Sequence, residues 1–288
     1  MLEAILSMFM FAGPSLGNYD RVVTTLQQIA EKYPANAKMV VIGVNDQGTP
    51  IQALQIGSGE TNSLIVATHH GNEYGSTAVA LGVADAFAQK PIEGQTVYII
   101  PVLNVTGYNK GRREESSLSA GALDANRDYT GPCKGGTAFR LKSTKALADF
   151  VEQKNIQISA TLHTYWPAVV YPWGISTNDL STPYDAQYQK LVADATIESR
   201  YQTGNNTQVL YAADGTFEDY AYWKHGIWSL LFELGFSHSP DTTALKNMVD
   251  ANVPGLRRFL ENSPKTRVVD HDFKGRCNVN ALQRMWLE

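Results

Sequence analysis

The sequence predicts a single α/β domain with a mixed, mostly parallel central sheet flanked by helices. Short apolar runs that suit buried strands alternate along the chain with amphipathic or Ala-rich runs that suit helices. No linker rich in Gly, Ser or Pro and no internal repeat divides the 288 residues, a length that suits one large domain. Apolar residues make up 43% of the chain, so it can bury a sizeable core.

The first expected elements are a helix and a hairpin. Residues 19–33 carry apolar side chains at helical spacing and stop at Pro34. Residues 38–44 and 51–56 are strand-like runs joined by the turn sequence NDQGTP. Strands and helices then alternate. The later strands are expected at 63–68, 96–103, 156–162 and 228–232, and the later helices at 76–89, 143–153, 185–197, 217–224 and 242–260.

Charge and cysteine content exclude some functions. The net charge is −4 and the pI about 5.9, so the chain lacks the basic character of a nucleic-acid binder. Cys133 and Cys277 form no CxxC pair, which argues against a thiolate zinc site. A disulfide between them and two free thiols both stay open. Nothing in the sequence indicates the oligomeric state.

The N-terminal residues 1–17 are expected to precede the main domain, which we place at 18–288. Residues 4–13 form an apolar run of signal-peptide length, although no positive charge precedes it and no A-x-A site follows. The run is too short to span a bilayer, which needs about 20 apolar residues. An apolar extension packed on the domain is the alternative. The run favours a periplasmic or secreted location over a cytoplasmic one.

Three ionisable residues follow buried strands: His70, His163 and Glu233. Ligands of open α/β sheets bind beyond the carboxyl ends of the strands, so these residues are expected to converge. Catalytic zinc takes three protein ligands and keeps one position for water. His70, Glu73 and His163 would hold one zinc ion per chain, and Glu233 would take a proton from the bound water. An H-x-x-E pair also arises by chance, so these residues alone leave a structural role open.

A dense polar loop, DANRDY, starts at Asp124. Asn126 and Arg127 stand side by side in it, and an arginine can grip a carboxylate with two parallel hydrogen bonds. A surface turn is the alternative interpretation of this loop.

Taken together, these segments resemble the M14 zinc carboxypeptidase family, which has a carboxypeptidase A-like fold. The resemblance covers about residues 18–262, and Tyr211 and Glu233 have the 22-residue separation of that family. It rests on five motifs in the family's order: HGNE at His70, GALDANRD around Asp124, ATLHTY with His163 and Tyr165, YAADGTFEDY from Tyr211, and LLFELG with Glu233.

The resemblance implies a zinc-dependent metallocarboxypeptidase that hydrolyses a C-terminal peptide bond. The implied zinc ligands are His70, Glu73 and His163, and Glu233 would be the general base. Asp124 would accept the second N–H of a ligand imidazole. An arginine before the DANR loop would stabilise the oxyanion, and Arg113 is preferred over its neighbour Arg112. The implied substrate-binding residues are Asn126, Arg127, Arg112, Glu218 and Tyr165, with Tyr211 closing over the substrate.

Glu218 follows Tyr211 by seven residues, at the position that in this family lies at the base of the pocket for the C-terminal side chain. An acid there would favour Lys, Arg or the amine-bearing end of diaminopimelate. A solvent-facing place on a short helix is the alternative. Asn72 departs from the family, in which many members carry Arg. The stretch from Cys133 to Lys142 is more basic than in relatives and would suit an acidic substrate segment.

The expected partner is a peptide or a bacterial cell-wall peptide. A zinc deacylase of small N-acyl amino acids is a second candidate, although the tyrosine segment and the DANR cluster favour a peptidase. A non-catalytic peptide-binding module would predict loss of a ligand or of the base, and all are present. The C-terminal extension from about residue 263 is expected to form a strap over the domain, tied to Cys133.

Overall fold

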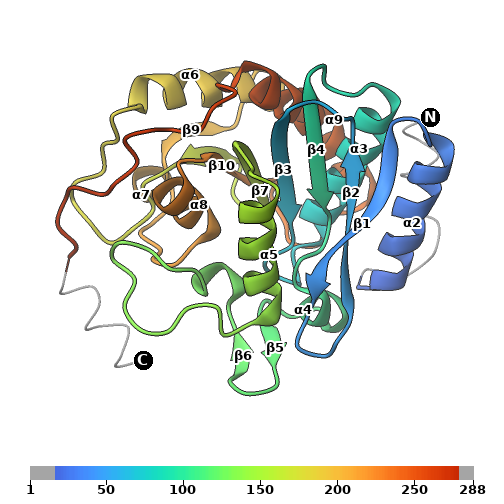
Figure 1. Ribbon diagram of the computed structural model, residues 1–288, viewed down its shortest axis with the longest axis horizontal. Coiled ribbons are helices and arrows are strands. Elements are labelled where there is room, and N and C mark those ends of the chain that lie inside the picture. The colour runs from blue at the N-terminus through green and yellow to red at the C-terminus, as the bar shows by residue number, and fades with distance from the viewer. Residues whose placement is uncertain (1–16, 279–288) are drawn as a thin grey trace.

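An eight-stranded mixed sheet runs through the part of the chain that the computed structural model describes, residues 17–278 (Figure 1). Its strands are β1 (Ala37–Val44), β2 (Pro50–Ile56), β3 (Thr61–Ala67), β4 (Gln95–Ile100), β7 (Ile158–His163), β8 (Ala168–Tyr171), β9 (Gln202–Asn205) and β10 (Trp228–Glu233). Their order is β1-β2-β4-β3-β7-β10-β8-β9. The central strands β4, β3, β7 and β10 are parallel, while β1, β2 and β8 join antiparallel. The expected fold class is thus confirmed.

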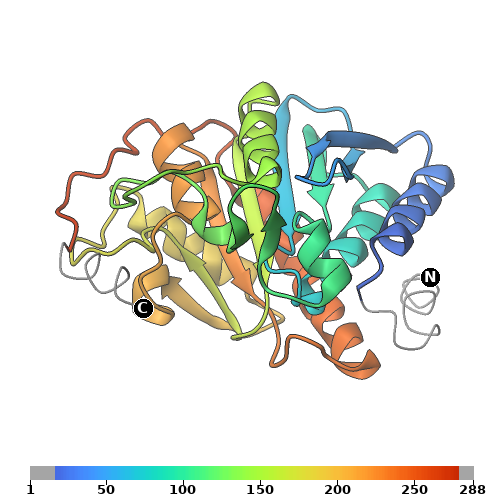
Figure 2. The same ribbon diagram turned by 90° about the horizontal axis from the view of Figure 1, so that it is seen from below.

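Helices cover both faces of this sheet. They are α2 (Tyr19–Lys32), α3 (Tyr74–Gln89), α4 (Val105–Lys110), α5 (Lys142–Gln153), α6 (Asp185–Ala195), α7 (Asn206–Val209), α8 (Phe217–His225) and α9 (Thr242–Asn262). Helices α3, α6 and α9 pack together on one face, and α5 and α8 lie on the other (Figure 2). Gly82 of α3 meets Val249 of α9 so closely that a Cβ would lie 2.6 Å from the valine side chain.

The central strands are continuous apolar runs because helices cover them on both sides. Every residue of β4 and β7 is buried, as are the last five residues of β3. Such complete burial fixes the positions of the residues that follow each strand, which is where the sequence places its polar candidates.

All strands and helices expected from the sequence are present, with shifts of a few residues at their ends. The strand expected from 156 begins at Ile158, and the strand expected to run to 103 ends at Ile100. The missed elements are short: strands β8 and β9, helices α4 and α7, the hairpin of β5 (Glu115–Ser117) and β6 (Gly121–Leu123), and the 3-10 turn η1 (Ala125–Arg127).

After α9, residues 263–278 run as a strap across the domain. Val268 donates a backbone hydrogen bond to Gly226 at the end of α8, and the Phe273 ring packs edge-on against Trp173. Cys277 forms a disulfide with Cys133. Of the two alternatives that the sequence leaves open, a disulfide or two free thiols, the structure contains the disulfide. The apolar run at 4–13 lies outside the described residues. Within them, no helix is long and apolar enough to cross a membrane.

Candidate metal centre and active site

The turn after β3 carries two of the three candidate ligands. Thr68 begins it with a φ of 62°, which is rare for a β-branched residue. Its hydroxyl bonds to Thr77 at 2.7 Å and to the carbonyl of Pro101 at 3.0 Å, which holds the strained turn. Gly71 is required in this turn because a Cβ would lie 2.1 Å from the backbone of Gly107. The turn thereby directs the side chains of His70 and Glu73 toward His163 at the end of β7.

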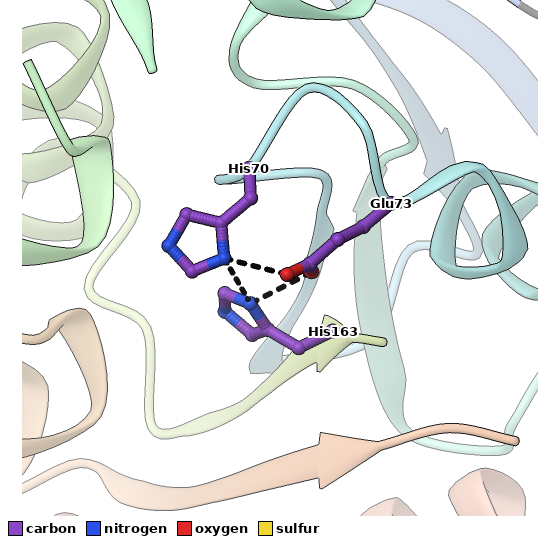
Figure 3. Close-up of side chains that lie close together, drawn as sticks. All are labelled: His70, Glu73 and His163. Atoms are coloured by element: carbon purple, nitrogen blue, oxygen red, sulfur yellow. Dashed lines mark hydrogen bonds and ion pairs between the residues drawn. The ribbon is translucent and has the colours of Figure 1, made fainter. Parts of the chain in front are cut away.

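His163 supplies the third ligand from the last position of β7, and the three side chains converge (Figure 3). The Nδ1 atom of His70 lies 2.7 Å from Glu73 Oε1, and the Nδ1 atom of His163 lies 3.0 Å from Glu73 Oε2. The two Nδ1 atoms are 3.2 Å apart. Two ligands at about 2.1 Å from a tetrahedral ion lie about 3.4 Å apart, so this spacing suits zinc.

The burial of this cluster also suits a cation. His70, Glu73 and His163 are at most 4% exposed, and Glu73 stands at the N-cap of α3 without capping that helix. Burial disfavours the charged form of Glu73, but His70 and His163 outweigh it and hold the pKa of this carboxyl well below its usual range. The cluster therefore presents an ionised carboxylate beside two imidazole nitrogens, the donor set of a catalytic zinc site.

Asp124 forms a hydrogen bond with His70, and Arg113 in turn holds Asp124. Asp124 Oδ1 lies 3.0 Å from His70 Nε2, and Arg113 donates to Asp124 Oδ2 from Nε at 3.1 Å and Nη2 at 2.8 Å. Burial opposes protonation of His70, but Glu73 and Asp124 raise its pKa to about 9. Metal binding displaces such a proton, because zinc takes the neutral imidazole. The predicted contact of Asp124 with a ligand imidazole is thus present.

The adjacent arginines take different positions. Arg113 Nη1 lies 3.2 Å from His70 Nδ1 and 4.0 Å from Glu73 Oε1, so its guanidinium stands at the candidate metal centre. Arg112 is exposed to solvent. The structure therefore brings only Arg113 of this pair to the ligands.

A narrow cavity opens beside the ligands. Its lining includes His70, His163, Glu233, Asn126, Arg127 and Tyr211. Arg127 Nη2 donates to the Tyr211 hydroxyl at 3.3 Å, and the Tyr211 side chain is otherwise largely exposed. The cavity is thus lined both by a guanidinium and by two of the candidate metal ligands, His70 and His163.

Glu233 ends β10 beside His163, and its Oε2 atom is buried without a hydrogen-bond partner among the described residues. Burial raises the pKa of Glu233 to about 7; His163 opposes this shift and Glu73 adds to it. A carboxyl with a pKa near neutrality and an uncommitted oxygen is suited to exchange protons with a reacting group.

Glu218 faces inward from the first turn of α8, and its side chain is only 7% exposed, which rules out the solvent-facing alternative. The Thr161 hydroxyl donates to its Oε1 atom, and Asn126 Nδ2 approaches its Oε2 atom at 3.5 Å. Its Oε1 atom also lies 4.0 Å from His163 Nε2. Glu218 is not among the residues that line the cavity, although Asn126 and His163, which it approaches, are.

Two predicted residues, Arg112 and Tyr165, stay outside the cluster, and two neighbours were not singled out. Tyr165 is half-exposed, with its ring 4.8 Å from that of His238. Thr161 and the backbone N–H of Thr164, which donates to Glu73 Oε2 at 3.0 Å, were missed. Strand alternation is the signal that could have revealed Thr161, because it shares a sheet face with His163.

The chain is similar in sequence and in fold to known carboxypeptidases. The chain is 24% identical to carboxypeptidase B of Astacus astacus over 74% of this chain and 84% of that protein. It is 27% identical to human carboxypeptidase B over 75% of this chain and 62% of that protein. The structure of bovine thrombin-activatable fibrinolysis inhibitor in complex with tick carboxypeptidase inhibitor superposes with a TM-score of 0.77 at 19% identity, covering 86% of this chain and 97% of that chain.

A more distant structural neighbour is the murein-tripeptide amidase of Escherichia coli O157. Its TM-score is 0.53 at 14% identity, and the match covers 76% of this chain and 91% of that chain. At such low identity these structural matches show a shared fold. The zinc carboxypeptidase profile of peptidase family M14 matches residues 22–254, most of the chain. The chain therefore belongs to the zinc carboxypeptidase family of hydrolases.

Proposed function

We propose that this peptidase removes the C-terminal residue of a peptide, with preference for a basic or diaminopimelate-type residue. The observation that carries the proposal is the cavity that Arg127 and Glu233 share with His70 and His163, two of the three candidate zinc ligands. Bound at this site, zinc lowers the pKa of a coordinated water and polarises a carbonyl. The protein side chains would perform the remaining tasks.

Arg127 would bind the terminal carboxylate through two parallel hydrogen bonds, with Asn126 beside it. The bond between Arg127 and the Tyr211 hydroxyl supports this role, because the exposed tyrosine is free to exchange that bond for one to substrate. Binding the terminal carboxylate at Arg127 would bring the last peptide bond near His70 and His163, which line the same cavity.

Glu233 Oε2 would accept a proton from the attacking water and later pass it to the leaving amine. The absence of a hydrogen-bond partner for Oε2 within residues 17–278 and the pKa of about 7 support both steps, because the same carboxyl must gain and lose a proton. Arg113, directed at the ligands, would stabilise negative charge that develops on the scissile carbonyl oxygen.

Glu218 would set the preference for a basic terminal residue. Its carboxylate is buried, and among the described residues the one hydrogen bond of Oε2 is the long contact with Asn126. A carboxylate with spare acceptor capacity in a buried position would attract an ammonium group. The fold shared with the murein-tripeptide amidase is compatible with a cell-wall peptide as substrate.

The disulfide between Cys133 and Cys277 supports an exported enzyme, because disulfides persist in oxidising compartments. A periplasmic or secreted location is accordingly part of the proposal.

The test uses peptides that differ only in their last residue: Lys, Phe or diaminopimelate. The proposal expects release of Lys or diaminopimelate with a kcat/KM at least about tenfold above that for Phe, a difference of about 1.4 kcal/mol. Preferred release of Phe would contradict the basic preference. Hydrolysis of N-acyl amino acids without release from any peptide would favour the deacylase instead.

A further inference from the structure

We propose that Glu218 is a positioning residue for the metal ligand His163, whose Nε2–H it accepts when the metal is bound. Glu218 would thereby serve His163 as Asp124 serves His70. The inference rests on the zinc site described above, but not on the proposed basic preference.

The first step concerns the tautomer of the two ligands. Both imidazoles turn Nδ1 toward Glu73, so Nδ1 is the atom that each offers to a metal. A neutral imidazole that binds metal through Nδ1 must carry its hydrogen on Nε2. The Nε2–H of His70 has an acceptor in Asp124 at 3.0 Å. The Nε2–H of His163 needs one as well, because a buried donor without a partner is costly.

The second step eliminates the nearest neighbour. Asn126 Nδ2 lies 3.4 Å from His163 Nε2, closer than Glu218 Oε1 at 4.0 Å. However, the Oδ1 atom of Asn126 accepts the backbone N–H of Phe217 at 2.9 Å. That bond fixes the amide with its NH₂ group toward His163, and an NH₂ group can only donate. Of these two neighbours of His163 Nε2, Glu218 is therefore the one that can accept its hydrogen.

The third step concerns how Glu218 is held. Thr161 lies two residues before His163 on β7, so both side chains project from the same face of the strand. The Thr161 hydroxyl donates to Glu218 Oε1, the same oxygen that lies nearest to His163. A shift of about 1 Å in the imidazole or the carboxylate would bring the pair to normal hydrogen-bond length.

The two roles of Glu218 use different oxygens. Oε1 is directed at Thr161 and His163, whereas Oε2 has the long contact with Asn126 and would face a substrate ammonium. Metal affinity and substrate preference are therefore separable measurements on the same residue.

The test measures zinc affinity without substrate, by competition with a chelator of known affinity. Mutation of a residue that hydrogen-bonds to a metal ligand typically lowers the metal affinity about 10–100-fold. Glu218→Gln should lose zinc affinity within that range, and Asp124→Asn should do the same through His70. Asp219→Asn is the matched control. Asp219 is the next residue of α8 and is also buried, but it accepts from Gly174 N at 3.0 Å, and no hydrogen bond or ion pair within the described part of the chain joins it to His70, Glu73 or His163. Its variant should keep the wild-type affinity.

Unchanged zinc affinity in folded Glu218→Gln, with a loss in Asp124→Asn, would overturn the inference. Changed preference among peptides would then still support the proposed function, so the two ideas fail separately. A second measurement needs no variant. In the zinc-loaded wild-type protein, the Nε2–H proton of His163 should resonate downfield by NMR, as that of His70 does beside Asp124. A shifted proton on His70 and none on His163 would also overturn the inference.

Discussion

Glu233 and His163 are register partners at the carboxyl ends of the parallel strands β10 and β7. Paired residues on neighbouring strands project to the same face of the sheet. This pairing sets the candidate base beside a candidate ligand without any contribution from a loop. It also means that the two side chains can be changed independently, because each is held by its own strand.

Replacing Glu233 by Gln should abolish proton transfer and preserve zinc. Loss of a positioned general base typically costs about 10²–10⁴-fold. We expect kcat to fall in that range while the zinc content stays at the wild-type level. Glu93→Gln, at an exposed position, is the control. Retention of more than about a tenth of wild-type kcat would argue against Glu233 as the base.

Replacing Arg127 by Met should weaken recognition of the terminal carboxylate. Hydrogen bonds to charged groups are worth about 1.5–3 kcal/mol, so kcat/KM should fall by about 10–150-fold. The exposed Arg200 provides a control variant, Arg200→Met. For a peptide whose C-terminus is amidated, Arg127→Met and the wild type should perform alike. An equal loss on both peptides would mean that Arg127 acts in some other way.

The two adjacent arginines should differ in their effect on the rate. Arg113 stands within 4.0 Å of Glu73, and Arg112 is exposed. Removing one donor that stabilises an oxyanion costs about 10²–10³-fold in kcat. We expect that loss for Arg113→Ala and a much smaller one for Arg112→Ala, measured as kcat on the same peptide. The reverse order would assign the role to Arg112.

Glu115 should make the domain less stable as the pH rises. Burial raises the pKa of Glu115 to about 8, and Ser143 donates a hydrogen bond to its Oε2 atom at 2.5 Å. Between the ordinary glutamate pKa and about 8, the folded state keeps a proton that the unfolded state has lost. Stability therefore falls with rising pH, by about 1.4 kcal/mol per pH unit for one such group.

Glu115→Gln should remove this contribution, because glutamine keeps an acceptor for Ser143 and has no charge to bury. The variant should gain stability relative to the wild type at pH 8 but not at pH 5, measured by urea unfolding. A difference from the wild type that is the same at both pH values would contradict the assignment.

The disulfide should stabilise the strap. Cys133 and Cys277 are 144 residues apart, and linking distant residues restricts the unfolded chain strongly. Replacing both by Ser should lower the free energy of unfolding by about 2–5 kcal/mol. Denaturant unfolding of the double variant would measure this loss. No change would mean that the packing of Phe273 on Trp173 suffices to hold the strap.

The sequence was most informative where burial is complete. The strands around His70, His163 and Glu233 are apolar runs whose ends can be located, and polar residues at those ends had to meet at one sheet edge. The short strands β8 and β9 were not predicted, because a hydrophobic pattern over four residues is too short to distinguish a strand from a loop.

The surroundings of the ligands were harder to predict because they depend on how α8 packs. Glu218 could be assigned to a pocket by resemblance. Its approach to His163, however, depends on which side of α8 faces the sheet and on the hydrogen bond that Thr161 donates to it. The choice between Arg112 and Arg113 likewise depends on side-chain direction after α4, which spacing alone does not determine.

Metal content and peptide hydrolysis, measured on one purified sample before and after chelation, test the central claim most directly. The account predicts about one zinc ion per chain, and release of a C-terminal residue that stops on chelation and returns when zinc is restored. A folded chain that binds no zinc and releases no residue from any of the test peptides would contradict it.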